Sequence, residues 1–150
     1  MQDFERLLKN INNLNINDIF FELWSDNRVQ NYIIDLNTEG KPTSQLYELG
    51  VDSLGNSLGE YSPFTIPFKV EKGQRFDHIT LKDTGDFYES FIVTPLKTGF
   101  KIDANPIKDD DNLFDLFGKD IVGLTEENQE RLVAFIEADF NKKLEERLFQ

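Results

Sequence analysis

The sequence predicts an α+β fold with N-terminal helices, a small antiparallel sheet with a hairpin, and a long C-terminal amphipathic helix. Apolar residues recur at helical spacing over residues 1–48, and an apolar residue recurs every four positions over residues 125–150. Between them, residues 49–124 are rich in loop residues and short apolar runs. The chain of 150 residues suits one domain, because two cores of half that length would each be marginal. We therefore expect residues 1–150 to form a single domain.

The N-terminal part carries the spacing of amphipathic helices. A first helix with one buried stripe is predicted by Phe4, Leu7, Leu8 and Ile11. The Asn-rich stretch 10–17 is expected to end it, and Asn17 or Asp18 to cap a second helix. The same spacing continues in Ile19, Phe20, Leu23 and Trp24, and again in Val29, Tyr32, Ile33 and Leu36. The last set forms either a third helix or a continuation of the second, and Gly40-Lys41-Pro42 ends it.

The middle part contains candidate strands. Residues 64–70 are interrupted by Pro67, which favours an edge strand or an extended arm over a central strand. Residues 79–81 form a very short candidate. Residues 91–94 and 99–102, joined by Pro95-Leu96-Lys97-Thr98, predict a hairpin.

The last helix is the clearest element. Thr125 is its predicted cap, with two glutamates in the first turn. Its apolar stripe consists of Leu132, Ile136, Phe140, Leu144 and Leu148, with Val133 beside it. Supporting i, i+4 ion pairs are expected between Glu127 and Arg131 and between Asp139 and Lys143.

Composition excludes several classes of function. The net charge of −12 repels phosphate backbones and argues against nucleic-acid binding through a groove of the protein's own. The absence of cysteine removes disulfides, thiolate metal sites and cysteine nucleophiles. No apolar run is long enough to span a bilayer, and the acidic N-terminus does not suit a signal peptide, so we expect no membrane association.

Catalytic and metal motifs are incomplete. Gly55-Asn56-Ser57-Leu58-Gly59 matches a nucleophile elbow, but it lacks the preceding strand and the following helix that such a motif needs. Residues 35–40 begin like a calcium loop, yet Leu46 stands where the bidentate glutamate belongs. The acidic run 109–112 and the single histidine, His78, suit a solvated surface better than a metal site. We expect no catalytic residue, no cofactor and no metal.

An ordered series of landmarks follows residue 50. A Gly-rich segment leads into Tyr61-Ser62-Pro63-Phe64-Thr65, and residues 81–91 read Leu-Lys-Asp-Thr-Gly-Asp-Phe-Tyr-Glu-Ser-Phe. Phe117-Gly118 follows, and then Gly123-Leu124-Thr125 opens the last helix. This order resembles the virion-morphogenesis, or tail-completion, proteins of Mu-like tailed phages over about 100 of the 150 residues. The arginine-proline that this family carries before its glycine-leucine is replaced here by Asp120-Ile121-Val122.

The residues that carry the resemblance are called the motif residues below. They are Tyr61, Ser62, Pro63, Thr65, Leu81, Thr84, Gly85, Phe87, Ser90, Phe91, Phe117, Gly118, Gly123, Leu124 and Thr125. Independently of the family, Thr84 can cap a short helical turn and Gly85 can supply backbone freedom at its start. Phe87 and Phe91, four residues apart, are expected to bury one face of that turn.

The resemblance implies a structural subunit of the phage neck, which completes the tail or joins head to tail. It implies a ring of identical copies in the virion, assembled in the host cytoplasm, with neighbouring portal, neck or tail proteins as partners. An acidic ring wall would let DNA pass without holding it. The alternative is an acidic DNA mimic or inhibitor that binds a nucleic-acid-binding partner.

Overall fold

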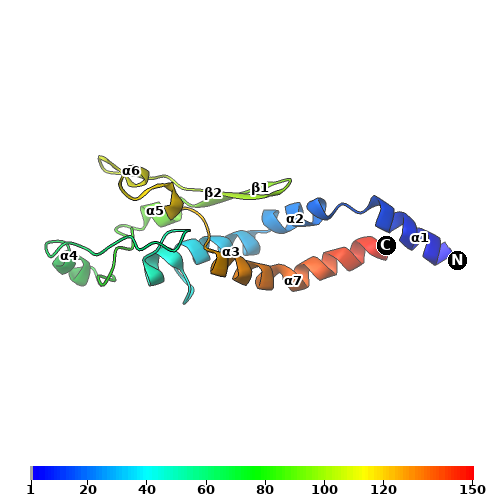
Figure 1. The fold of residues 1–150 in the computed structure, drawn as a ribbon, viewed down its shortest axis with the longest axis horizontal. Helices are drawn as coiled ribbons and strands as arrows, with labels where there is room; N and C mark the ends of the chain where they lie inside the picture. The colour runs from blue at the N-terminus through cyan, green and yellow to red at the C-terminus, as the bar shows by residue number, and fades with distance from the viewer. Residues whose placement is uncertain (1) are drawn as a thin grey trace.

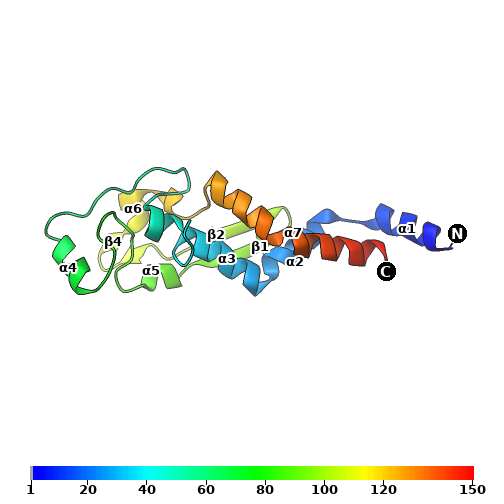
Figure 2. The same ribbon diagram turned by 90° about the horizontal axis from the view of Figure 1, so that it is seen from below.

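The computed structural model describes residues 2–150 and shows an elongated molecule (Figure 1). Helix α1 (Gln2–Asn13) lies at one end, beside the last turns of α7 (Glu126–Leu148), and α4 (Ile66–Glu71) lies at the other end. The view from below shows the same order along the long axis (Figure 2). The mixed α+β class is confirmed.

The remaining elements lie between these ends. The helices are α2 (Ile16–Ser25), α3 (Asn27–Asn37), α5 (Asp86–Glu89) and α6 (Leu113–Phe117), with a π-helical turn η1 (Gln45–Leu49) and a 3-10 turn η2 (Lys119–Ile121). The strands are β1 (Ile92–Leu96), β2 (Gly99–Asp103), β3 (Ile107–Lys108) and β4 (Asp111–Asn112). No helix within residues 2–150 combines the length and the apolar character needed to cross a bilayer.

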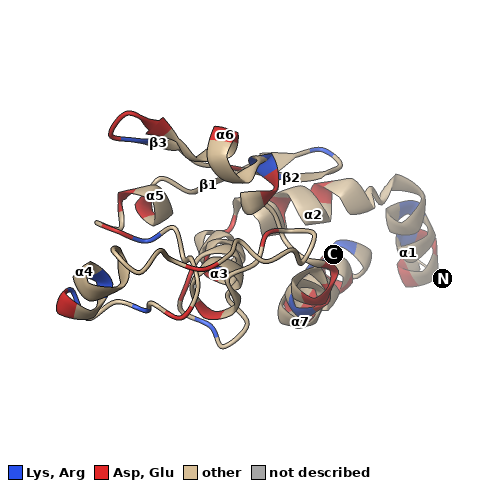
Figure 3. Ribbon diagram, turned by 60° about the vertical axis from the view of Figure 1, so that its left-hand side comes forward, with Lys and Arg blue, Asp and Glu red and all other residues tan. Residues whose placement is uncertain are grey.

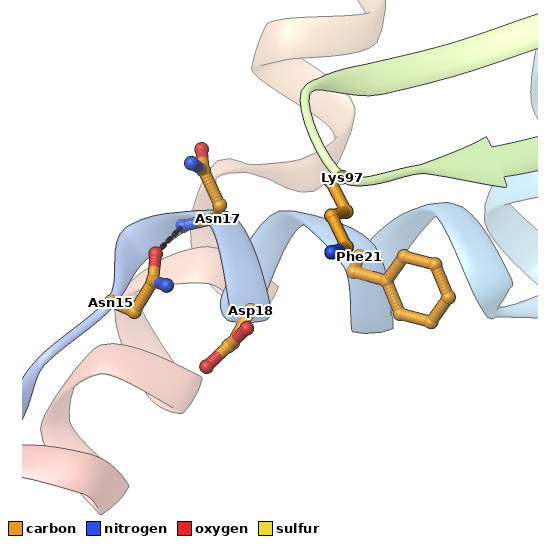
Figure 4. A pocket seen from close by; sticks show the side chains of 5 residues that line it. All are labelled: Asn15, Asn17, Asp18, Phe21 and Lys97. Atoms are coloured by element: carbon orange, nitrogen blue, oxygen red, sulfur yellow. Dashed lines mark hydrogen bonds between the residues drawn. The ribbon is translucent and has the colours of Figure 1, made fainter.

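Helices α1, α2 and α3 are separate. Asn15, and not Asn17 or Asp18, caps α2, because its side-chain oxygen accepts a hydrogen bond from the Asn17 amide at 3.0 Å (Figure 4). The shallow pocket drawn there, about 340 Å³ in volume, lies between this cap and the β1–β2 turn. Asp26 caps α3 in the same way through the Arg28 amide, which separates α3 from α2.

The predicted hairpin is confirmed, but Pro95 and Leu96, which were predicted to lie in its connection, belong to β1. Strands β1 and β2 pair antiparallel with Val93 opposite Ile102 and Leu96 opposite Gly99, so that only Lys97 and Thr98 form the turn. A second, very short hairpin joins β3 to β4, and its turn consists of Asp109 and Asp110. The acidic run 109–112 therefore consists of the exposed turn of this hairpin and its second strand.

Two apolar clusters form the interior. The larger packs α2, α3 and α7 on the β1–β2 hairpin and contains Ile19, Leu23, Trp24, Val29, Ile33, Leu36, Val93, Leu124, Leu132 and Ile136. The smaller contains Leu46, Phe87, Tyr88, Phe91, Leu113 and Ile121. Ile34 and Ile102 pack against both clusters and join them.

A buried network of amides fixes the segment that leads into α7. Asn37 donates to the Ile121 carbonyl at 3.0 Å and accepts from the Gly123 amide at 2.7 Å. Gln45 donates to the Gly123 carbonyl at 2.8 Å and accepts from the Thr125 amide at 2.9 Å. Because buried polar groups are costly when unpaired, these bonds fix one position for this segment on α3 and η1.

The predicted cap and stripe of α7 are largely confirmed. The Thr125 hydroxyl accepts from the Asn128 amide at 3.2 Å. Leu132 and Ile136 are buried, whereas Val133 is 63% exposed. The two expected i, i+4 ion pairs are not formed. Asp139 instead pairs with Arg28 of α3, and Lys143 with Glu22 of α2, because α7 packs against these helices along its length.

Three other predictions were wrong. The stripe of α1 is not buried: Phe4, Leu8 and Ile11 are 55%, 44% and 47% exposed, because no other element within residues 2–150 covers that face of the helix. Residues 64–70 form no strand or arm but the helix α4, in which Pro67 occupies the first turn, where its missing amide costs nothing. Residues 79–81 form no strand, since their backbone groups bond to loop residues and tyrosine hydroxyls.

Candidate assembly site

Helix α4, residues 79–83, the β3–β4 hairpin and α6 enclose a pocket of about 450 Å³ at the end of the molecule opposite α1. We call it the α4 pocket. Four motif residues line it, namely Tyr61, Thr65, Leu81 and Phe117. These residues come from three separate motifs of the sequence, and the fold brings them together.

Hydrogen bonds between Ser62 and Thr65 shape the chain just before α4. The Ser62 hydroxyl lies 3.0 Å from the Thr65 hydroxyl and accepts from the Thr65 amide at 3.3 Å, which turns the chain into α4. Pro63 and Phe64 are exposed on this turn. Ser62 and Pro63 therefore shape the entry to α4 and do not line the pocket.

Two tyrosines hold residues 79–83 against the body. Thr80 is 1% exposed, and its amide donates to the Tyr61 hydroxyl at 3.0 Å while its carbonyl accepts from the Tyr88 hydroxyl. Burial raises the pKa of Tyr88, so this hydroxyl stays a neutral donor. The next residue, Leu81, adopts φ +60°, a conformation that costs a non-glycine residue roughly 1–3 kcal/mol. The two hydrogen bonds to the Thr80 backbone keep Leu81 at the pocket wall despite that cost.

Lysines gather in the α4 pocket although the chain is strongly acidic. Lys69, Lys72, Lys82 and Lys108 line it, beside three carboxylates, those of Asp83, Asp109 and Asp111. Lys72 and Lys108 both bind Asp83, the second at 3.2 Å, and Lys82 binds Glu39 at 2.7 Å. The hydrogen bond from Lys72, together with that from Lys108, holds the pKa of Asp83 at about 2.

Lys69 differs from the other three lysines. It is only 7% exposed, and its ammonium donates to the Gln74 side chain at 3.1 Å and to the Lys82 carbonyl. It also lies 5.0 Å from the centre of the Tyr61 ring. Within residues 2–150 no carboxylate lies in ion-pair contact with it. Its hydrogen bonds therefore join α4 to the segments that contain Gln74 and Lys82.

The central motif forms a turn beside the α4 pocket. The Thr84 hydroxyl accepts from the Asp86 amide at 3.2 Å, and Gly85 has φ +94°, as the motif predicted for a cap followed by a glycine. Phe87 and Phe91 are buried with their ring centres 5.1 Å apart. Ser90 accepts from the Asn105 amide at 2.9 Å and so ties α5 to the chain after β2. The predicted burial of Phe87 and Phe91 is confirmed, whereas a role of this turn in folding stays a prediction.

Two other groups of motif residues lie at the end of α6 and at the start of α7. Phe117 and Gly118 end α6, and Gly118 has φ +87°. Gly123, Leu124 and Thr125 belong to the buried network at the start of α7. The motif residues therefore divide among the pocket, the interior and exposed turns, the last including Ser62, Pro63, Thr84 and Gly118.

The elbow-like serine and the histidine have structural partners. The Ser57 hydroxyl accepts from the Gly59 amide at 3.1 Å, whereas His78 Nε2 lies 2.7 Å from the Tyr47 carbonyl oxygen. No hydrogen bond joins Ser57 to His78 in the described chain. Nor do three His, Asp or Glu side chains of residues 2–150 gather as metal ligands.

Sequence reasoning missed the pocket's lysines and Phe68. The signal was present around Pro67, which starts a helix after Thr65, so that Phe68, Lys69 and Lys72 share neighbouring positions on it. Lys82 and Lys108 could not be assigned to this pocket from their spacing, because only the tertiary fold brings them there.

No family model matches the chain, and the searches of curated proteins and of solved structures likewise find no significant match. The resemblance to phage tail-completion proteins therefore depends on the order of the motif residues.

Proposed function

We propose that the chain is a structural subunit of a tailed-phage neck, acting in tail completion or head–tail joining as one of several copies in a ring around the DNA path. The observation that carries this proposal is the gathering of Tyr61, Thr65, Leu81 and Phe117 around one pocket. These motif residues come from distant parts of the chain, as expected if the resemblance marks a shared contact surface.

The exposed apolar residues support an assembly role. Phe64, Phe68 and Leu116 are 85%, 64% and 59% exposed at the α4 end, and α1 exposes its apolar stripe at the other end. Clustered exposed apolar side chains mark contact surfaces of proteins that function in complexes. An elongated subunit with such a surface at each end suits a place between two neighbours (Figure 1).

The charge distribution supports the DNA path. Acidic residues are spread over elements from α1 to α7, with fewer lysines and arginines between them (Figure 3). A wall of this kind denies phosphates the cations that would hold them, so DNA can slide past it. The same charge suits an acidic mimic of DNA, which is the alternative proposal. A mimic would stay a monomer or dimer and bind a basic partner.

Quantitative peptide counting on purified virions tests the neck proposal. We expect peptides of this chain in mature particles, in a fixed ratio to the portal protein of the same particles. Absence from particles, together with capture of a basic DNA-binding protein by the purified chain, would favour the mimic. Absence without such capture would leave neither proposal standing.

A further inference from the structure

Strand β2 has an outer edge that no other strand of residues 2–150 covers, because it pairs only with β1. The register shows which backbone groups face outward. Pro95 of β1 stands opposite Phe100 of β2, and proline has no amide hydrogen, so these two residues do not exchange hydrogen bonds. Bonded and non-bonded pairs alternate along an antiparallel ladder, so Thr94 and Lys101 form a bonded pair.

This alternation directs the backbone groups of Phe100 and Ile102 away from β1. No other backbone group of residues 2–150 forms a hydrogen bond with them. On β1 the outward groups are those of Val93 and Pro95, and Pro95 contributes no donor. A proline is one of the features that keep an exposed edge from pairing. The edge of β2 lacks this protection and presents two donors and two acceptors at the spacing of a sheet.

An apolar pocket of about 360 Å³ adjoins the same edge. We call it the β2 pocket. Phe100 and Ile102 line it, whereas no described residue of β1 does, so it lies on the open side of the hairpin. Its other walls come from α2, from the start of α7 and from the segment before α7. The apolar side chains of these walls include Trp24, Leu124, Leu132 and Val133.

We propose that an extended peptide segment of another protein chain adds to the edge of β2 as a third, antiparallel strand. Its backbone exchanges hydrogen bonds with Phe100 and Ile102, which is how an open edge recognises an extended peptide. Residues directly opposite each other in an antiparallel pair lie on the same face of the sheet. The residues that bond to Phe100 and Ile102 therefore direct their own side chains towards the β2 pocket.

The two faces of β2 define the sequence of such a segment. Towards the β2 pocket the walls are apolar, so the entering side chains are apolar. On the opposite face Lys101 and Asp103 are exposed and pair with each other at 3.4 Å, so alternate residues of the segment are polar and carry no required charge. The ligand is thus a strand in which apolar and polar residues alternate. This inference does not depend on a ring of subunits.

The probe is a short peptide, Thr-Val-Thr-Val-Thr-Val-Thr, acetylated and amidated at its ends. Trp24 is the only tryptophan of the chain and lines the β2 pocket, so its fluorescence measures binding. Amide hydrogen exchange by NMR locates it. In the free chain, the amides of Phe100 and Ile102 should exchange faster than that of Lys101, which bonds to Thr94. Saturating peptide should slow the exchange of Phe100 and Ile102.

Two N-methylated peptides test the backbone contacts without changing the protein. One carries the methyl group on its central valine amide nitrogen, the other on that of a neighbouring threonine. The valine amide faces β2 in the proposed arrangement, whereas the threonine amide faces away. We expect methylvaline to weaken binding by about tenfold or more, through a lost hydrogen bond and a blocked edge, and methylthreonine by less than about threefold.

A matched pair of protein variants tests the β2 pocket. Val133→Asp places a charge at its wall and should abolish binding, whereas Leu54→Asp should leave it unchanged. Leu54 is the control because it is a similarly exposed apolar residue that does not line the β2 pocket. Both side chains are exposed, and circular dichroism verifies that both variants fold.

Other results would overturn the inference. Equal weakening by the two methyl groups would show that the peptide does not use the edge of β2, and weakening by methylthreonine alone would show that it does not add antiparallel. Absence of binding at millimolar peptide, or slow exchange of Phe100 and Ile102 in the free chain, would show that the edge is not available. Peptide counting on virions is independent of these outcomes, so the neck proposal stands or falls separately.

Discussion

Replacement of Asn128 by leucine tests whether the buried amide network holds α7 to the body of the protein. Asn128 is 1% exposed, and its side-chain amide lies within hydrogen-bonding distance of the Thr43 carbonyl at 3.0 Å, the Gln45 side-chain oxygen at 2.9 Å and the Leu36 carbonyl at 3.3 Å. Leucine has nearly the same shape but no donor, so these acceptors lose their shared partner. At roughly 0.5–1.5 kcal/mol per bond, the expected cost is about 2–4 kcal/mol.

Thermal and urea unfolding, followed by circular dichroism, measure this cost. For a chain of this length, each kcal/mol lowers Tm by about 2–4 °C, so we expect a drop of about 5–15 °C. Asn141→Leu is the matched control, since Asn141 lies exposed on the same helix and its replacement should change stability by less than about 0.5 kcal/mol. Equal melting of the two variants would refute the role given to the network.

Three further substitutions probe the fold around the site. In urea unfolding, Gly50→Ala should lower the free energy of unfolding by about 1–3 kcal/mol more than Gly55→Ala does. Both glycines have positive φ, but only at Gly50 would the new Cβ meet the His78 ring, at 2.4 Å. Equal losses would mean that the His78 ring moves aside freely. Gly85→Val should lower the free energy of unfolding of the isolated chain by about 1–3 kcal/mol, because valine is strained at a φ of +94°. If the variant instead melts like wild type while particles fail to join heads to tails, the turn is an assembly contact. Asp83→Asn should reduce the loss of unfolding free energy that occurs as the pH falls below about 4. The folded pKa of Asp83 lies below its unfolded value of 3.8, so its ion pairs contribute up to about 2 kcal/mol above that value, and this contribution is lost as pH falls from about 4 to 2. A wild-type and a variant profile that run parallel from pH 6 to 2 would contradict the Lys72–Asp83–Lys108 cluster.

Elements with strong local signals could be predicted from the sequence. The cap at Thr125 and the four-residue apolar step placed α7, and turn residues between two β-rich runs placed the β1–β2 hairpin. The capped turn of Thr84 and Gly85 was also readable, since it depends on neighbours in the chain.

The predictions that were wrong concern features that depend on contacts between distant residues or on the choice between two local structures. Periodicity identified the apolar face of α1 but could not indicate that this face stays exposed in the described part of the chain. Pro67 was read as a strand interruption, although a proline in the first turn suits a helix equally well. The ion pairs of Asp139 and Lys143 were assigned within α7, where spacing allows them, but they form with α2 and α3.

The candidate site was predictable only in part. Tyr61, Thr65, Leu81 and Phe117 were singled out by the order of motifs, but their meeting at one pocket required the fold. The lysines around them come from α4, the segment before α5 and β3, so no local pattern joins them.

Electron cryo-microscopy of the neck of purified virions tests the central claim most directly. The neck proposal predicts a ring of density around the DNA path into which copies of this elongated subunit fit. A neck whose densities are all filled by other proteins would contradict the neck assignment itself.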